Sequence, residues 1–162
     1  MLEKYLAKGM AASWLPTHEG GQNGTGAEIS VGTKEVKGGE GIYLPFVPNG
    51  INYVETQGKD VISFNFSGCI MAAYTVNGSR RVCHVSTGSQ QDCKAAWENI
   101  KKGAKDVKEF RPHEHIDTDT LQKVGSYKGC YGLITAEGKC YAITVSGDAK
   151  VTVCAALSPV AV

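Results

Sequence analysis

Apolar and polar residues alternate over much of this chain, a pattern typical of β-strands. The clearest case is residues 63–87, SFNFSGCIMAAYTVNGSRRVCHVST, where two strand-like runs flank Asn77-Gly78. Asn-Gly between two such runs predicts a β-hairpin, because both positions of a two-residue turn need positive φ. A two-residue loop sets the register and places Met71 opposite His84.

The same register puts Cys69 opposite Ser86, so that Cys69 and His84 share one face of the hairpin as diagonal neighbours. Diagonal neighbours on a sheet lie about 7–8 Å apart at Cα, within joint reach of a thiol and an imidazole. A slip of one residue in one strand would move the two side chains to opposite faces. A Cys-His pair is therefore expected if the turn is tight.

Seven further segments have the period and flanking turns of strands. They are Glu28–Val31, Ile42–Val47, Asn52–Glu55, 60–68 (DVISFNFSG), Tyr127–Thr135, Lys139–Ser146 and Lys150–Leu157. In segment 60–68, alternation places Val61, Ser63, Asn65 and Ser67 on one, polar face and Ile62, Phe64 and Phe66 on the face towards the core.

Two segments predict helices. In residues 2–12 the apolar side chains Leu2, Tyr5, Leu6 and Met10 fall at helical spacing. Residues 89–103 begin with Ser89 and Asp92 at the spacing of a capping box, continue with Ala96, Trp97 and Ile100 as a buried stripe, and end at Gly103.

Two other segments predict loops. Residues 17–41 hold eight of the twenty glycines but lack the Gly-Lys-Ser/Thr ending of a phosphate loop, which favours a mobile surface loop near a site entrance. Residues 107–123 predict no regular element. His113 and His115 lie there among carboxylates, yet no third ligand is fixed by spacing, so a solvated loop is favoured over a metal site.

Composition narrows the class of protein. The 162 residues are expected to form one domain, 1–162, and the twenty glycines with 20% charged residues favour a β-rich or α+β fold. A net charge of +1 without a basic stripe argues against a nucleic-acid partner. No apolar run is long enough for a membrane span, and the N-terminal residues lack the pattern of a signal peptide.

Six cysteines stand at positions 69, 83, 93, 130, 140 and 154. Cys83, Cys140 and Cys154 lie in apolar runs, where a reduced cysteine behaves as a small buried hydrophobe. Without an export signal, reduced thiols are favoured over three disulfides. Cys130, flanked by glycine in YKGCYG, is a second candidate nucleophile but has no histidine at hairpin range, so a core or edge cysteine is the favoured interpretation.

The Cys69-His84 pair has the residue types of a thiol nucleophile and its acid-base partner. An imidazolium at His84 would lower the pKa of the Cys69 thiol. The backbone N–H groups of Gly68 or Cys69 are candidates for an oxyanion hole, and the hydroxyl of Ser63 is placed to orient the imidazole.

Phe66-Ser67-Gly68-Cys69, with a histidine fifteen residues on, resembles the catalytic core of the cytotoxic necrotizing factors, which carry a Leu-Ser-Gly-Cys step. Ser63, six residues before the cysteine, is similar to the threonine of the chemoreceptor glutamine deamidases and of the related Burkholderia lethal factor. Phenylalanine for leucine is a tolerable apolar change. Serine for threonine leaves the third member of the triad open, since a backbone carbonyl can also hold the histidine.

The resemblance covers about 25 of the 162 residues. It implies an α+β fold, a β-sandwich of mixed sheets flanked by helices. It also implies a cofactor-independent amidohydrolase that deamidates a surface glutamine of a protein substrate, with Cys69, His84 and Ser63 as the catalytic residues. A bacterial toxin or effector delivered into a target-cell cytosol is expected, with a cytoplasmic enzyme as the alternative. A cysteine peptidase, an acyltransferase or transglutaminase, and a disulfide-bridged secreted binding module are the other interpretations.

Overall fold

The computed structural model describes residues 1–21, 23–88, 93–116, 127–147 and 152–162. In chain order its strands are β1 (Glu28–Ile29), β2 (Lys34–Val36), β3 (Gly41–Pro45), β4 (Ile51–Glu55), β5 (Asp60–Phe64), β6 (Ile70–Val76), β7 (Ser79–Val85), β8 (Lys105–Phe110), β9 (Tyr127–Ile134), β10 (Cys140–Gly147) and β11 (Thr152–Val160). The described helices are α1 (Lys94–Lys102) and the 3-10 helices η1 (Leu2–Tyr5), η2 (Lys37–Gly39) and η3 (Pro112–His115).

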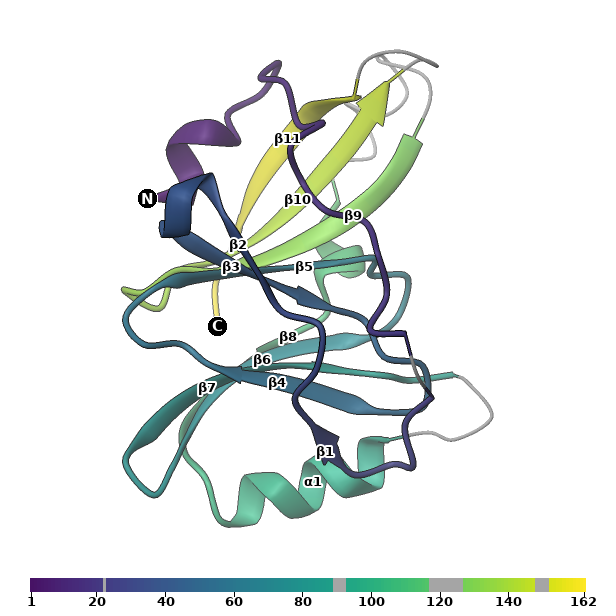
Figure 1. The fold of residues 1–162 in the computed structure, drawn as a ribbon, viewed down its shortest axis with the longest axis vertical. Coiled ribbons are helices and arrows are strands. Elements are labelled where there is room, and N and C mark those ends of the chain that lie inside the picture. The colour runs from purple at the N-terminus through teal and green to yellow at the C-terminus, as the bar shows by residue number, and fades with distance from the viewer. Residues whose placement is uncertain (22, 89–92, 117–126, 148–151) are drawn as a thin grey trace.

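The strands form two mixed sheets (Figure 1). The five-stranded sheet has the order β1-β4-β7-β6-β8, and the six-stranded sheet has the order β11-β10-β9-β5-β3-β2. Two pairings are parallel, β1 with β4 and β3 with β5, and the others are antiparallel. The predicted sheet-rich fold with mixed sheets is confirmed. Where several flanking helices were expected, the described residues contain one α-helix.

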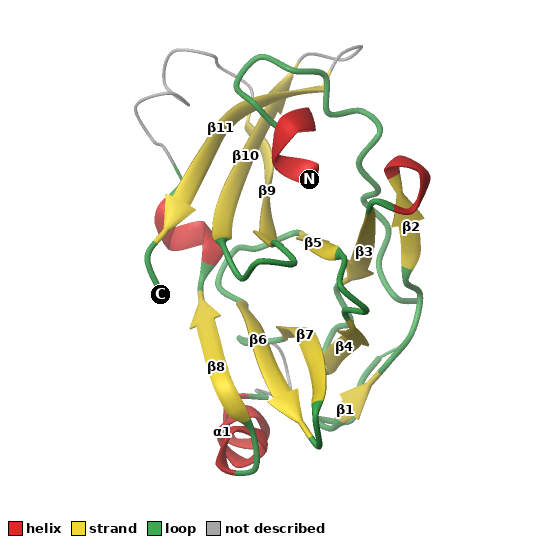
Figure 2. Cartoon of the chain, turned by 90° about the vertical axis from the view of Figure 1, so that its left-hand side faces the viewer, coloured by secondary structure: helices red, strands yellow, loops and turns green. Residues whose placement is uncertain are grey.

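The two sheets share a hydrophobic core, here called the inter-sheet core. Leu44 and Val61 reach it from the six-stranded sheet, and Met71 and Val82 reach it from the five-stranded sheet. Each sheet is also covered on its outer face. Figure 2 shows η1 beside the six-stranded sheet and α1 against the other, where Trp97 is fully buried. The central strands of both sheets are therefore buried on either face, whereas edge strands such as β2 and β8 keep exposed residues.

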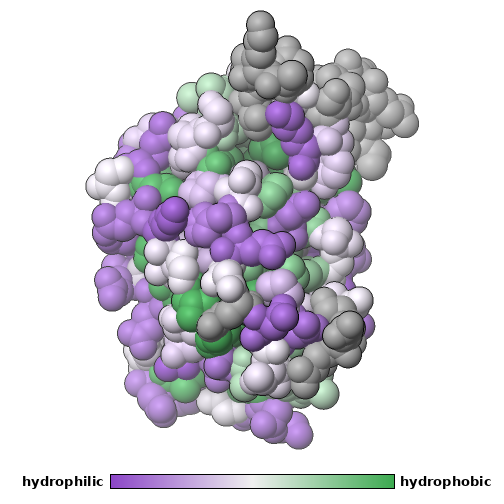
Figure 3. Space-filling model, turned by 45° about the vertical axis from the view of Figure 1, so that its right-hand side comes forward, coloured by the Kyte–Doolittle hydropathy of each residue, from purple (hydrophilic) through white to green (hydrophobic). Residues whose placement is uncertain are grey.

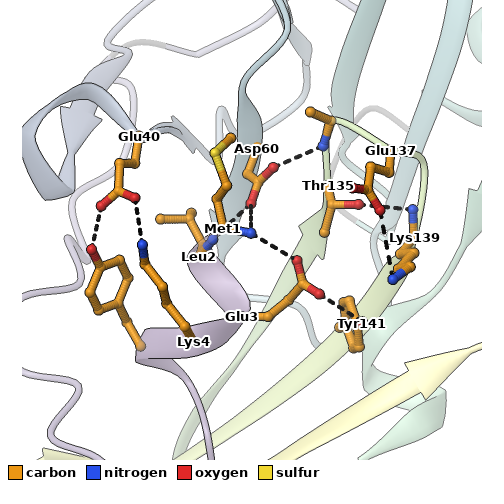
Figure 4. A network of polar contacts seen from close by, with 12 residues as sticks. Met1, Leu2, Glu3, Lys4, Glu40, Asp60, Thr135, Glu137, Lys139 and Tyr141 are labelled. Atoms are coloured by element: carbon orange, nitrogen blue, oxygen red, sulfur yellow. Dashed lines mark hydrogen bonds and ion pairs between the residues drawn. The ribbon is translucent and has the colours of Figure 1, made fainter.

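A buried carboxylate fastens the N-terminal segment to this framework (Figure 4). Asp60, at the start of β5, is 1% exposed. One of its oxygens accepts the backbone N–H of Leu2 at 2.8 Å, and the other accepts that of Ala136, in the β9–β10 turn, also at 2.8 Å. These contacts satisfy the buried acid and hold η1 over the outer face of the six-stranded sheet.

The hairpin predicted around Asn77-Gly78 is confirmed, register included. Both turn residues have positive φ, 51° and 79°, as a type I′ turn requires. Ile70 pairs with Val85 and Met71 with His84 along β6 and β7. The hairpin is thus built by its own local sequence.

The helix predicted over residues 2–12 is wrong beyond η1. The backbone N–H of Gly9 donates to the Cys154 carbonyl at 2.7 Å, and the Cys154 N–H donates to the Met10 carbonyl at 2.9 Å. Residues 9 and 10 therefore pair with β11 instead of continuing a helix, and Met10 is 39% exposed although its spacing assigned it to a buried stripe.

The predicted faces of segment 60–68 also need correction. Ser63 is fully buried, as is Val61, because their face turns towards the inter-sheet core and not towards water. Ile62 packs on the outer face under the N-terminal segment. β5 ends at Phe64, and Phe66 lies in the inter-sheet core with Val61, on the opposite side from its predicted partner Ile62.

Residues 107–123 contain regular structure that periodicity did not indicate. β8 pairs with β6 at the edge of the five-stranded sheet, and η3 follows it. Helix α1 ends at Gly103 as predicted, whereas Ser89 and Asp92 lie outside the described residues. The segment 17–41 carries β1, predicted within Glu28–Val31, and the unpredicted β2.

Figure 3 shows hydrophilic residues across one face of the molecule, with several separate apolar patches among them. Within the described part of the chain, no helix has the length and apolar character needed to cross a membrane.

Candidate active site

Cys69 and His84 lie on the same side of the five-stranded sheet. Cys69 immediately precedes β6, and His84 is the sixth residue of β7. The register and the membership of Cys69 and Met71 in the inter-sheet core place both side chains on the face towards the other sheet. Cys69 is a free thiol that is 6% exposed, and His84 is fully buried.

Ser63 joins His84 to the six-stranded sheet. Its Oγ lies 2.7 Å from His84 Nδ1 and donates to the backbone carbonyl of Leu44, 2.5 Å away. A hydroxyl has one proton, and a carbonyl can only accept. The Ser63 proton therefore goes to Leu44, and Nδ1 must donate its own proton to Ser63 Oγ. This assignment leaves Nε2 of His84 unprotonated, with its lone pair free.

The free nitrogen is enclosed by aromatic rings. The Phe66 ring stacks on the imidazole with centroids 4.1 Å apart and planes 10° apart, and the Phe46 ring is 5.2 Å away. Nε2 is buried without a hydrogen-bond partner. Burial lowers the pKa of His84 from 6.5 to about 3, so the imidazole is neutral at physiological pH. A neutral imidazole with a free Nε2 is a proton acceptor.

The thiol of Cys69 is also held in its neutral form. Burial raises its pKa, and the hydrogen bonds to the backbone and side chain of Thr87 and the charge of Arg111 oppose that rise. The expected thiolate-imidazolium pair is thus not the form that this conformation favours. Both shifts have the same cause, since removal from water penalises each charged form.

The Ser-Gly-Cys step is fixed by two donors on one carbonyl. Thr87 Oγ1 donates to the Gly68 oxygen at 2.8 Å, and an N–H of the Arg111 guanidinium donates to the same oxygen. Thr87 follows β7, and Arg111 follows β8. Three segments of the chain therefore meet at the Gly68 carbonyl.

Cys69 lines a pocket with a volume of about 460 Å³, within the size range of small-molecule sites in proteins. Its lining residues are Thr17, Glu19, Phe46, Phe64, Asn65, Ser67, Cys69, Thr87 and Gly88. Hydroxyl and amide groups are thus combined with aromatic rings beside the thiol. Thr17 and Glu19 come from the predicted entrance loop, and Phe46 both lines the pocket and lies with its ring centroid 5.2 Å from that of His84.

The other candidates from the sequence do not join this site. Cys130 is fully buried, and burial raises the pKa of its thiol to about 12. His113 and His115 lie on η3, and the described residues contain no group of three metal-ligating side chains. None of the six cysteines forms a disulfide in this structure, and all six are buried, which agrees with the predicted reduced thiols.

Four residues of the site were missed by sequence reasoning. Leu44 acts through its backbone carbonyl, which leaves no mark in a sequence, and Phe46 and Arg111 lie far from the hairpin along the chain. Thr87 is the last residue of the segment 63–87 and lies two residues beyond β7. Its position next to Ser86, the predicted partner of Cys69, could have indicated that it contacts the Ser-Gly-Cys step.

The resemblance noted in the sequence rests on the residues of this site alone. In comparisons of the whole chain, no protein family, no curated protein and no solved structure matches it.

Proposed function

We propose that the chain is a cysteine-dependent protein-glutamine deamidase, with Cys69 as nucleophile, His84 as general base and acid, and Ser63 as the residue that orients His84. The observation that carries the proposal is the Leu44–Ser63–His84 chain of hydrogen bonds, which leaves Nε2 unprotonated on the same sheet face as the thiol. Nε2 has no hydrogen-bond partner in this conformation, Cys69 Sγ included, so proton transfer requires the two side chains to approach one another when a substrate binds.

The reaction begins when His84 Nε2 takes the thiol proton and the Cys69 sulfur bonds to the carboxamide carbon. The developing oxyanion is held by backbone N–H groups at Gly68 or Cys69. The imidazolium returns its proton to the departing nitrogen, the C–N bond breaks, and ammonia leaves a thioester. Water, deprotonated by His84, then attacks the thioester, and the C–S bond breaks to give glutamate and the free thiol.

Burial defines the resting state of this cycle. Because burial lowers the pKa of His84 and raises that of Cys69, both groups are neutral at rest, and the thiol proton has to pass to His84 during the reaction. Entry of a substrate next to Phe46 would bring polar groups to the enclosed pair.

The pocket supports a carboxamide substrate presented by a protein surface. Asn65, Ser67 and Thr87 provide hydrogen-bonding groups next to Cys69, and Phe46 and Phe64 provide apolar walls. The two mixed sheets are compatible with the β-sandwich of the deamidase toxins that the Ser-Gly-Cys step resembles. By that resemblance we assign the protein to the toxins or effectors that act in a target-cell cytosol, with a cytoplasmic deamidase as the alternative.

The proposal is tested by incubating the protein with an N-blocked glutaminyl-glycine dipeptide and with a mixture of cytosolic proteins. Deamidation gives free ammonia and a mass gain of about one dalton on glutamine side chains, because NH₂ is replaced by OH through the thioester. Cys69→Ala should abolish both signals. Peptide fragments would instead indicate proteolysis, and a mass increase equal to that of an added amine would indicate transglutamination. The proposal would be contradicted if neither substrate changed in a way that depends on Cys69.

A further inference from the structure

We infer that Arg111 is a positioning residue of the oxyanion site, acting with Thr87 through the Gly68–Cys69 peptide. This inference rests on the proposed function of Cys69. Both side chains donate to the Gly68 carbonyl oxygen, and neither contact was assigned a role by the sequence.

The link from Arg111 to the oxyanion is the planar peptide unit. The Gly68–Cys69 peptide bond is trans, so its C=O and N–H point in opposite directions. Two donors that fix the direction of the Gly68 carbonyl therefore fix the direction of the Cys69 N–H. That N–H is one of the two candidate donors to the oxyanion that forms when the Cys69 sulfur attacks a carbonyl carbon.

Arg111 reaches this peptide from outside the substrate pocket. It lines a separate cavity of about 390 Å³, together with Trp97, Glu109 and Glu114, and none of the lining residues is shared with the Cys69 pocket. A substrate at Cys69 would therefore not meet the guanidinium directly. Arg111 can therefore hold the Gly68 carbonyl on the side away from the pocket, while the pocket beside Cys69 stays open to a substrate.

Two hydrogen bonds on one carbonyl also change the charge on the opposite end of the peptide. Donors at the Gly68 oxygen polarise the peptide unit and make the Cys69 N–H a stronger donor. A guanidinium contributes more than a neutral donor because its hydrogen bonds are charge-assisted. Arg111 thereby adds to transition-state stabilisation without touching the substrate.

Two reactions of the same thiol test this inference. Acetylation of Cys69 by p-nitrophenyl acetate passes through a tetrahedral oxyanion, whereas alkylation by iodoacetamide is a direct displacement that forms none. Both consume the same thiolate, so their rate ratio cancels changes in thiol ionisation. Rates are measured on Cys69 by peptide mapping, with Cys69→Ala as the blank.

Arg111→Met should lower the acetylation-to-alkylation ratio by about tenfold, which is less than the 10²–10³-fold loss typical of removing an oxyanion donor outright. Thr87→Val should lower the ratio in the same direction, and Arg111→Lys should restore part of it. Glu114→Gln is the matched control, because it removes the 3.9 Å ion pair with Arg111 and leaves the Gly68 carbonyl untouched. Its ratio should equal that of the wild type.

A ratio within about twofold of wild type in both Arg111→Met and Thr87→Val would overturn the inference, even if both rates fell together, since loss of thiolate alone gives that result. Thr87→Val keeps the test valid if Arg111→Met fails to fold. Wild-type protein that is alkylated at Cys69 but never acetylated there would contradict the proposed function itself, and the inference with it.

Discussion

Ser63 Oγ lies 2.7 Å from His84 Nδ1, and this hydrogen bond connects β5 of the six-stranded sheet to β7 of the five-stranded sheet. Both side chains are fully buried. Because Ser63 also donates to the Leu44 carbonyl, the bond fixes which nitrogen of His84 carries the proton. The orientation and the tautomer of the candidate base are thus set by one hydroxyl.

Replacing Ser63 tests that role directly. Ser63→Ala should lower kcat by about 10–100-fold, by analogy with the loss that follows removal of the hydrogen-bond partner that orients a metal-ligating histidine. Ser63→Thr keeps the hydroxyl and should retain much more activity. Equal activity of the alanine and wild-type proteins in ammonia release would contradict the role of Ser63.

Cys69→Ala and His84→Ala should each abolish ammonia release while the fold survives. Cys69 removal deletes the nucleophile and little buried volume, so thermal unfolding of Cys69→Ala should match the wild type within a few degrees. His84→Gln provides a second test of the base, since a carboxamide fits the buried site and still meets Ser63 but cannot take up the thiol proton. Activity retained in any of the three variants would exclude the pair.

The buried histidine predicts a pH dependence of stability. Burial lowers the pKa of His84 from 6.5 to about 3, so between these values the unfolded chain binds one more proton than the folded chain. The contribution of His84 to the free energy of unfolding is therefore fully present above the pKa of the unfolded chain, and it is lost as the pH falls towards the pKa of the folded chain. The slope in that window is about 1.4 kcal/mol per pH unit.

Urea unfolding of wild type and His84→Gln between about pH 5 and pH 6.5 isolates this contribution from that of the carboxyl groups. The wild type should lose stability more steeply as pH falls. Parallel curves for the two proteins would show that His84 is not buried in its neutral form.

Phe46 is expected to control the water around His84. Phe46→Ala removes one of the two rings against the imidazole, so the pKa of His84 should rise from about 3 towards 6.5. Proton NMR titration measures the shift, with the His84 signal assigned by its absence in His84→Gln. Phe64→Ala is the matched control, because Phe64 lines the same pocket but packs on Tyr131 at 4.3 Å. A shift in the control and none in Phe46→Ala would contradict this prediction.

Iodoacetamide should label Cys69 before any other cysteine of the native protein. Cys69 lines the pocket, and Thr87 and Arg111 oppose the rise in its pKa. Cys130 is fully buried, and the pKa of its thiol is raised to about 12. Peptide mapping after partial alkylation gives the order. Earlier labelling of Cys130 would count against Cys69 as the nucleophile, and unfolding without reductant should release all six thiols.

The parts of the fold that local sequence determines were predictable. Asn77-Gly78 fixes its own hairpin, and with it the shared face of Cys69 and His84. The strands that became β9 and β10 were placed with their connecting turn. In these cases the turn residues and the alternation are close together in the chain, so no distant contact is needed to choose the structure.

Distant contacts account for most of the errors. Residues 9 and 10 leave the helical path to pair with Cys154, far along the chain. Ser63 was assigned to a wet face because alternation in β5 is between polar and apolar residues, whereas both faces of its sheet are covered. Alternation distinguishes two faces but does not say what packs against each, so the burial of the Ser63–His84 contact was not predictable.

The division of the site between two sheets has a consequence for how the protein loses activity. One sheet supplies the hydroxyl and the carbonyl behind it, and the other supplies the imidazole and the sulfur. Displacement of one layer by an ångström would break the proton path while every strand remained paired, and misplacement on that scale is enough to cost about 10²-fold in rate. The rate of turnover therefore depends on the spacing between the two sheets. Mild denaturant should abolish activity at concentrations that do not yet change the circular dichroism spectrum.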